Sequence, residues 1–247
     1  MKKDIHLTGA DLINMCQVRV GDLGKYALVP GPLERLKAIL RKIENPIKNF
    51  SFFEYSMYTG TYEGIKVSAG NGGRYSADNA ICAEMLCAAG VPNIIRTGTC
   101  GALEEKMQVG DMIITTDVIR GDGVTPYYVK DDFKTKADSD IVKALIEAAK
   151  LFKVTYHVGT IWTTDAFLRE TRELVEEIKG KGGIAVDMVT SAILTIAQLN
   201  KVRAGSIMVV SDNLMTGEMG FVNPKYYDGE TKMIDVAMQA IKILEGR

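Results

Sequence analysis

Hydrophobic positions along the chain fall into two alternating patterns. Short apolar runs bounded by glycine, proline or polar residues are typical of buried strands, and most of the segments between them carry apolar residues at helical spacing. The patterns predict strands at 25–30, 56–60, 65–70, 111–119, 156–162, 184–188 and 206–210, and helices at 33–43, 77–89, 141–152, 169–179, 190–199 and 230–244. This alternation indicates an α/β fold with a largely parallel or mixed sheet. No repeat or linker divides the chain, so we expect one domain over residues 1–247.

The stretch 93–103 begins as an apolar strand and is expected to end in a turn of small residues. The strand delivers Arg96 and Thr99 to its carboxyl end. A guanidinium supplies forked donors, a hydroxyl adds another, and the glycines at 98 and 101 let backbone N–H groups approach a ligand. These residues predict an oxyanion pocket. The alternative is a strand followed by an ordinary turn, with Arg96 in solvent.

Other predicted strands also end in polar or glycine-rich segments. The loop 70–76 is the most glycine-rich of the chain and opens the helix at 77–89, with Ser76 as its expected N-cap. Asp165, Asp187 and Asp212 each lie at or just beyond the end of a predicted strand. Because ligands in open α/β sheets bind beyond the carboxyl ends of strands, we expect one shared site there.

Composition excludes several classes of function. The net charge of the 247 residues is -1 without a basic block, which gives nucleic-acid binding no electrostatic support. No apolar run approaches the length of a membrane span, and the first residues lack the apolar segment of a secretory signal. The four cysteines lack metal-type spacing and there are two histidines, so we expect no metal site and a reducing, cytoplasmic location.

Seven features, in this order, resemble the nucleoside phosphorylase family, which includes hexameric purine nucleoside, methylthioadenosine and uridine phosphorylases. They are VPGPLER, YTGTYEG, the glycine loop with its helix, IIRTGTCGAL, HVGTIWTTDAF, AVDM and VVSDNL. The resemblance implies a mixed, twisted, partly barrel-like sheet flanked by helices. It also implies reversible phosphorolysis of a nucleoside, with inorganic phosphate as co-substrate and no cofactor. A homo-oligomer is implied too, a hexamer built from dimers whose sites are completed across the interface.

The resemblance also assigns roles to individual positions. Those matching the family's phosphate site are Gly31, Arg35, Arg96 and Thr99; those matching its base site are Phe167, Cys100 and Gly101; those matching its ribose site are Met188, Asp187 and, from a neighbouring subunit, His6. Asp212 matches the acid that protonates or hydrogen-bonds purine N7. Structural alternatives remain open: Arg35 could be a solvated helix residue, Phe167 and Met188 could pack in the core, and Asp212 could cap a turn.

The chain departs from the family at positions that contact phosphate and sugar. Pro32 stands where the family has an aspartate, and Phe53 stands where a neighbouring subunit donates a phosphate-binding arginine. We hypothesise that Arg74, in the glycine loop, replaces this guanidinium; the alternative is that it faces solvent. Val189 replaces a glutamate that holds the ribose 2′ and 3′ hydroxyls. Either Asp187 or another group compensates, or the activity is weak, or the sugar differs from an ordinary riboside, which favours a deoxy sugar or a 5′-modified nucleoside.

The leading hypothesis is phosphorolysis of a purine nucleoside, with methylthioadenosine among the candidate substrates. Asp212 favours a purine, because the family's pyrimidine enzymes lack that acid and use a glutamine/arginine pair for uracil. The amino-terminal sequence IHLTGADL resembles the uridine enzymes, so a uridine phosphorylase is the first alternative. A nucleosidase that uses water, and a non-catalytic nucleoside-binding homologue, are the others.

Overall fold

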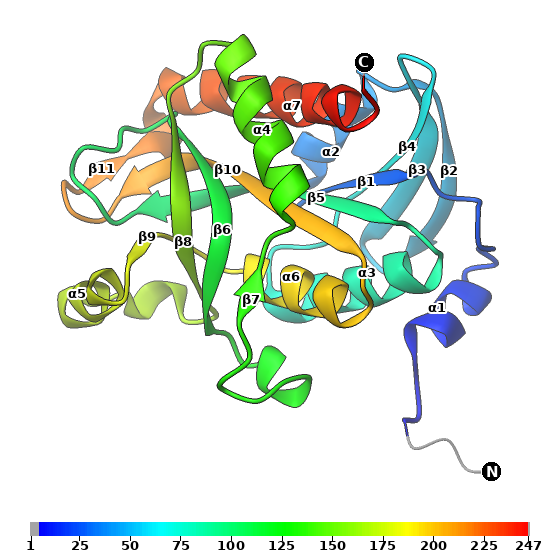
Figure 1. Ribbon diagram of the computed structural model, residues 1–247, viewed down its shortest axis with the longest axis horizontal. Coiled ribbons are helices and arrows are strands. Elements are labelled where there is room, and N and C mark those ends of the chain that lie inside the picture. Colours follow the sequence, from blue (N-terminus) through cyan, green and yellow to red (C-terminus); the bar gives the residue numbers. More distant parts are fainter. Residues whose placement is uncertain (1–4, 247) are drawn as a thin grey trace.

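The computed structural model describes residues 5–246 and contains one eleven-stranded sheet between two layers of helices (Figure 1). The strands are β1 (Tyr26–Pro30), β2 (Glu44–Phe52), β3 (Tyr55–Tyr62), β4 (Ile65–Gly70), β5 (Asn93–Ala102), β6 (Met112–Gly121), β7 (Thr135–Lys136), β8 (Tyr156–Thr164), β9 (Gly183–Asp187), β10 (Arg203–Asn213) and β11 (Glu218–Met219). The helices are α1 (Gly9–Met15), α2 (Leu33–Leu40), α3 (Ser76–Ala88), α4 (Ser139–Leu151), α5 (Arg172–Gly180), α6 (Thr190–Leu199) and α7 (Pro224–Leu244), with 3₁₀ turns η1 (Thr125–Tyr127), η2 (Phe167–Arg169) and η3 (Gly220–Val222).

Part of the sheet closes on itself. β10 pairs with both β6 and β5, while β8 and β9 connect β6 to β5, so these five strands form a barrel-like ring. The sheet continues from β5 through β1, β4 and β3 to β2. β5 is parallel to β1 and β10 but antiparallel to β9. The prediction of an α/β fold with a mixed, partly barrel-like sheet flanked by helices is confirmed.

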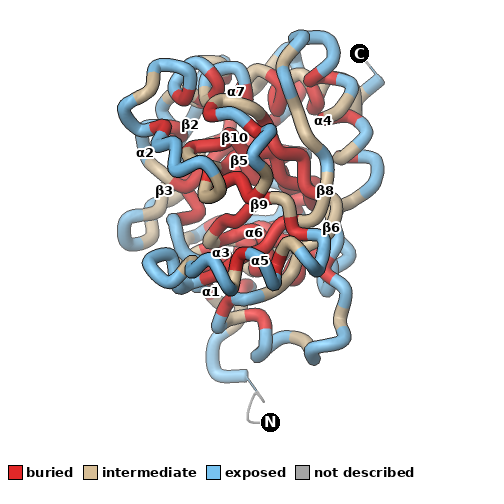
Figure 2. Tube along the Cα trace, turned by 90° about the vertical axis from the view of Figure 1, so that its left-hand side faces the viewer, coloured by how far each residue is buried: buried red, intermediate tan, exposed pale blue. Residues whose placement is uncertain are grey.

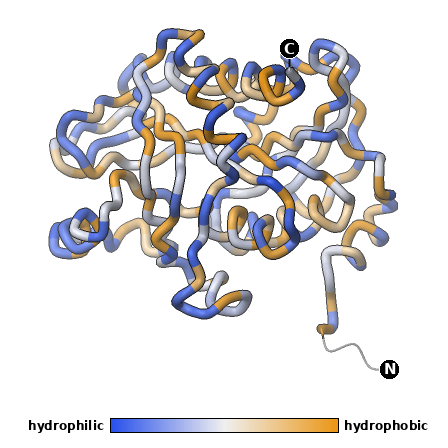
Figure 3. The backbone as a smooth tube through the Cα atoms, in the orientation of Figure 1, coloured by the Kyte–Doolittle hydropathy of each residue, from blue (hydrophilic) through white to orange (hydrophobic). Residues whose placement is uncertain are grey.

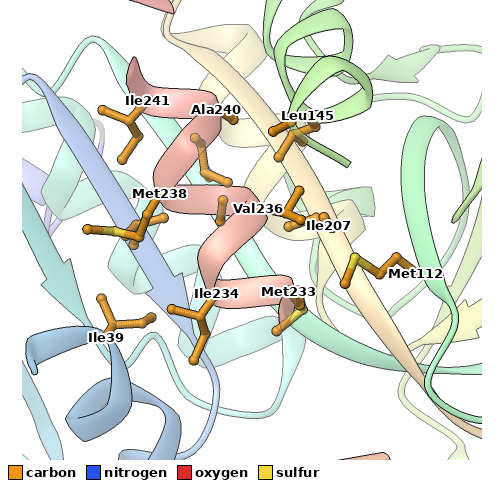
Figure 4. Close-up of a cluster of buried hydrophobic side chains, with 14 of the residues drawn as sticks. Ile39, Met112, Leu145, Ile207, Met233, Ile234, Val236, Met238, Ala240 and Ile241 are labelled. Atoms are coloured by element: carbon orange, nitrogen blue, oxygen red, sulfur yellow. The ribbon is translucent and has the colours of Figure 1, made fainter. Parts of the chain in front are cut away.

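Apolar side chains fill both sides of the sheet. Helices α2, α4 and α7 cover one face and α1, α3 and α6 cover the other (Figure 1). Ile207 of β10 and Leu145 of α4 belong to the cluster that packs against Val236 of α7 (Figure 4). Buried residues therefore concentrate in the central strands (Figure 2), whereas the outer helix α5 is largely hydrophilic (Figure 3). No helix within residues 5–246 is both long and apolar enough to cross a membrane.

Several local predictions differ from the structure. β5 runs on to Ala102, because β10 pairs with it along its length and holds the small residues of the expected turn in the strand. Tyr75, not Ser76, is the N-cap of α3. The Ser76 hydroxyl instead donates a hydrogen bond to the Met188 carbonyl at 2.9 Å, which joins the glycine loop to the end of β9. The sequence pattern also missed β2, whose residues are mostly exposed.

Asp122 fixes the segment that follows β6. Its buried carboxylate accepts hydrogen bonds from the Ser191 hydroxyl at 2.6 Å, from the Thr125 amide and hydroxyl at 2.7 and 2.8 Å, and from the Val124 amide at 2.9 Å. Burial acts to raise the pKa of Asp122, but the four hydrogen bonds outweigh it and lower the pKa below its ordinary value. The ionised carboxylate therefore stabilises the contact between this segment and α6.

We expect Asp122→Asn to lower the free energy of unfolding by about 1.5–3 kcal/mol at neutral pH, because the amide replaces an acceptor with a donor. The pKa of this carboxyl is lower in the folded than in the unfolded state. Its contribution is therefore present above the unfolded pKa, about 3.9, and disappears as the pH falls through the folded-state pKa. Urea unfolding of the variant, of the wild type and of the exposed control Asp132→Asn at several pH values checks this. A control as destabilised as Asp122→Asn would contradict the argument.

Candidate active site

Most of the predicted site residues meet in one cavity of about 190 Å³ where β5, β9 and β10 end. Because β9 is antiparallel to β5 and pairs with its last residues, the carboxyl ends of the two strands lie together. Predicted residues that line the cavity are Arg74, Arg96, Thr99, Cys100, Gly101, Phe167, Asp187, Met188 and Asp212. Residues from the ends of three strands thus line one cavity, as the sequence led us to expect.

Arg96 is a buried cation with unused hydrogen-bonding capacity. Its side chain is 4% exposed, and Nη1 donates to the carbonyls of Val29 and Thr97 at 3.1 and 3.0 Å. Nε has no partner among residues 5–246. Burial lowers the pKa of Arg96 to about 10, while the charge of Asp187 acts in the opposite direction. A buried guanidinium with an unpaired N–H is stabilised by an anion, and burial excludes the alternative of a solvated Arg96.

The turn between β1 and α2 and the glycine loop both approach Arg96. A Cβ atom on Gly31 would lie 3.3 Å from the Gly73 carbonyl oxygen, 3.6 Å from Arg74 Cγ and 3.7 Å from Arg96 Nη1. Gly31 thus brings a backbone segment close to both arginines. Arg74 is exposed but lines the cavity, and Thr99 is half-buried in its wall. The glycine loop and β5 therefore supply donors to the cavity wall, whereas Gly31 approaches both arginines without lining the cavity itself.

Arg35 is buried but does not line the cavity. Its Nε and Nη2 contact Oε1 of Glu230 on α7 at 2.7 and 2.6 Å, and Nη1 donates to the Thr97 carbonyl at 3.0 Å. The structure thus pairs Arg35 with an internal carboxylate, and its phosphate-binding role stays a prediction. His6 is exposed in the arm that leads away from α1 (Figure 1), so its role in a neighbouring subunit also stays a prediction.

Asp187 uses its carboxylate inside the protein. Oδ1 accepts a hydrogen bond from the Thr163 hydroxyl at 2.7 Å, and Oδ2 accepts from the Thr190 hydroxyl and amide at 2.6 and 3.0 Å. The Thr190 amide belongs to the first turn of α6, so Asp187 holds the start of that helix. Beside it, Met188 and the buried Val189 present sulfur and hydrocarbon to the cavity. This wall therefore lacks an uncommitted carboxylate.

Asp212 lies near the end of β10 and lines the same cavity. Ser211 donates a hydrogen bond to its Oδ1 at 2.7 Å, and a Cβ atom on Gly101 would lie 3.1 Å from Oδ2, so the glycine leaves room for the carboxyl group. Burial raises the pKa of Asp212, although the Ser211 hydrogen bond partly offsets the rise. A carboxyl with a raised pKa can hold a proton and donate it. Phe167 is 51% exposed and presents its ring at the same part of the cavity.

Sequence reasoning missed Glu170, which also lines the cavity. The predicted helix over 169–179 placed it on a charged surface, but α5 begins at Arg172 and Glu170 ends the turn η2. Burial and the charge of Asp212 raise the pKa of Glu170 to about 7. Thr171 was the available signal, because its hydroxyl accepts from the Leu174 amide as an N-cap and marks the true helix start.

Residues 5–246 contain no group of three or more histidine, cysteine, aspartate or glutamate side chains arranged to hold a metal. The cavity is lined by Arg74 and Arg96, which both lie close to Gly31, and by the three carboxyl groups of Glu170, Asp187 and Asp212, of which Asp187 is committed to threonines. Such a site can bind an anion near the arginines and protonate or hydrogen-bond a second group near the carboxyls.

Comparison with known proteins identifies the family. Residues 25–242 match the model of the phosphorylase superfamily. The chain is 31% identical to a uridine phosphorylase from Thermococcus kodakarensis over 91% of this chain and 83% of that protein. It is 29% identical to a DeoD-type purine nucleoside phosphorylase from Bacillus cytotoxicus over 91% and 96% of the two chains, and 28% identical to a guanosine phosphorylase from Halorubrum lacusprofundi over 91% of each.

The fold is shared with solved structures as well. The uridine phosphorylase from Vibrio fischeri ES114 superimposes with a TM-score of 0.85 over 92% of this chain and 95% of that one, at 23% identity. The resemblance to nucleoside phosphorylases and the expectation of an enzyme are thereby confirmed. The chain belongs to the phosphorylase superfamily.

Proposed function

We propose that the protein catalyses reversible phosphorolysis of a purine nucleoside. The observation that carries the proposal is the position of Asp212, a partly buried acid that lines the same cavity as Phe167. In the reaction a phosphate oxygen forms a bond to C1′ of the sugar as the C1′–N9 bond breaks. The electron pair goes to the base, and N7 takes the proton of Asp212, which makes the purine a better leaving group.

The arginine end of the cavity supports phosphate as the nucleophile. Arg96 offers an unpaired Nε, Thr99 offers a hydroxyl, and Arg74 adds a second cation near Gly31. Fixed donors of this kind bind a phosphate dianion and hold it in line with the reacting carbon. The protein needs no cofactor for this chemistry, because both substrates bind directly to side chains and backbone.

The sugar would lie between these two ends, against Met188 and Val189. The carboxylate of Asp187 is committed to Thr163 and Thr190 and offers no replacement for a ribose-binding glutamate. The 2′ hydroxyl therefore has no charged acceptor in this wall, and a 2′-deoxynucleoside fits as well as a riboside. A completed site includes His6 of a neighbouring subunit, in a homo-oligomer built from dimers.

A uridine phosphorylase is the second candidate, because the relative from Thermococcus kodakarensis carries that name. Uracil has no N7 to receive the proton of Asp212. No glutamine within residues 5–246 lines the cavity, so the glutamine/arginine pair expected of the pyrimidine enzymes is missing from its wall. Both observations favour a purine.

The first experiment measures base release from adenosine, inosine, methylthioadenosine, deoxyadenosine and uridine, each with and without phosphate. We expect purine release that requires phosphate. The kcat/KM for deoxyadenosine should lie within about threefold of that for adenosine, because the charged hydrogen bond to the sugar, about 1.5–3 kcal/mol in this class of contact, is absent.

Other results of this panel identify the alternatives. Release of purine at the same rate without phosphate indicates a nucleosidase. Release of uracil without release of any purine indicates a uridine phosphorylase. Either result contradicts the proposed function.

Replacement of Arg74 tests the phosphate end of the cavity. Arg74→Ala should raise KM for phosphate by about five- to tenfold, because it removes one partly exposed cation, while KM for the nucleoside stays nearly constant. Arg172→Ala is the matched control, since this exposed arginine on α5 does not line the cavity. An unchanged KM for phosphate in Arg74→Ala would contradict a role of Arg74 in phosphate binding.

Replacement of Asp212 tests the proton transfer. Asp212→Asn should lower kcat for adenosine by about 10²-fold or more, because the amide can hydrogen-bond N7 but cannot protonate it. A nucleoside of an N7-methylated purine already carries positive charge on its base and needs no proton. Its kcat should therefore fall by less than about tenfold in the same variant. Equal losses for both substrates would contradict a role in protonation.

A further inference from the structure

Glu170 and Asp212 place two carboxyl groups side by side in the cavity. Both also line a shallower hollow at its outer edge, so they face the same space from η2 and from β10. Ser211 donates a hydrogen bond to Asp212, whereas the Glu170 carboxylate has no hydrogen-bond or ion-pair partner among the described residues. The oxygens of Glu170 therefore remain available to a ligand.

Two carboxyl groups in one buried space do not ionise independently. Burial and then the charge of Asp212 raise the pKa of Glu170 to about 7, and burial raises the pKa of Asp212. Near neutral pH the pair holds a proton that two separate carboxylates would have lost. The two carboxyls share this proton, so a bound ligand decides which of them donates a hydrogen bond and which accepts one.

The N7 edge of a purine presents two neighbouring groups that such a pair can distinguish. In adenine, N7 accepts a hydrogen bond and the 6-amino group donates one; in guanine, N7 and O6 both accept. A pair with one proton offers one donor and one acceptor, which matches the adenine edge. A 6-oxo group would instead face an ionised carboxylate with no proton between them.

We propose that Glu170 is a specificity-determining residue that selects 6-aminopurine nucleosides. Its carboxylate accepts a hydrogen bond from the 6-amino group, while Asp212 donates its proton to N7 as the C1′–N9 bond breaks and the phosphate–C1′ bond forms. This inference rests on the proposed function, because it concerns the base bound in the same cavity. Glu170 itself gives up no proton during the reaction on a 6-aminopurine.

The other charged groups around the cavity do not compete for this role. Arg74 and Arg96 lie at the phosphate end, and Arg169 lines the outer hollows. Asp187 is the remaining carboxylate of the cavity, and its two oxygens accept hydrogen bonds from threonines. Glu170 is therefore the carboxylate of the cavity wall whose acceptor capacity is free.

The test compares kcat/KM for adenosine and inosine in the wild type, in Glu170→Gln and in the control Glu173→Gln. A glutamine can turn either its oxygen or its amide nitrogen toward the base, so it accepts from a 6-amino group and donates to a 6-oxo group. We expect the adenosine-to-inosine ratio to fall by about tenfold or more in Glu170→Gln. Glu173 is exposed in the first turn of α5, and its replacement should leave the ratio within about twofold.

Two further readouts separate recognition from a general loss of structure. Inhibition constants of free adenine and hypoxanthine should converge in Glu170→Gln, independently of turnover. In the wild type the adenosine-to-inosine ratio should fall when the pair takes up its second proton, at a pH below about 7, because both carboxyls are then protonated and Glu170 donates to O6. In Glu170→Gln the ratio should lose this pH dependence.

The outcomes separate this inference from the proposed function. If the wild type phosphorolyses purine nucleosides but Glu170→Gln keeps the wild-type ratio and its pH dependence, the role of Glu170 is overturned and the proposed function stands. If the wild type releases uracil and no purine, both are overturned.

Discussion

The burial of Arg96 is the constraint on which the site depends. A guanidinium that is 4% exposed must be satisfied from inside the protein, and two backbone carbonyls satisfy only Nη1. The unpaired Nε of Arg96 still needs an acceptor, which an anion bound in the cavity would supply. Gly98 leaves room for this guanidinium, because a Cβ atom there would lie 3.4 Å from Cζ of Arg96. A glycine at position 98 thus leaves room for both the buried guanidinium and Met208.

A second buried arginine, Arg35, lies close to Arg96 and influences its charge. Arg35 donates to the Thr97 carbonyl, which also accepts from Arg96, so the two cations share an acceptor. The charge of Arg35 lowers the pKa of Arg96, after the larger effect of burial. Glu230 offsets this repulsion through its ion pair with Arg35, which joins α7 to α2. One layer of the fold is therefore coupled electrostatically to the anion-binding end of the cavity.

The sequence predicted the elements that have strong periodicity and missed those decided by long-range pairing. α6 was predicted at its exact bounds, 190–199, because it is apolar and follows a strand end. The continuation of β5 depends on β10, more than a hundred residues later, and local sequence cannot show it. Local sequence also could not show the surroundings of two carboxylates. The carboxylate of Asp187, which was expected to contact the sugar, accepts hydrogen bonds from threonines. Glu170, which was expected on the surface, lines the cavity because the helix begins only after Thr171.

The charged groups of the cavity suit group transfer between an anion and a base. Arg74 and Arg96 line it together with Glu170 and Asp212, and burial, not an arginine, is the main influence on the pKa of each of these two carboxyls. The arginines favour an anionic nucleophile, whereas carboxyls with raised pKa values favour delivery of a proton to a leaving group that gains negative charge. If the carboxyls lay beside the arginines, ion pairing would lower their pKa values and remove the proton. Burial, together with the charge of Asp212 on Glu170, instead raises both pKa values in the cavity that the arginines also line.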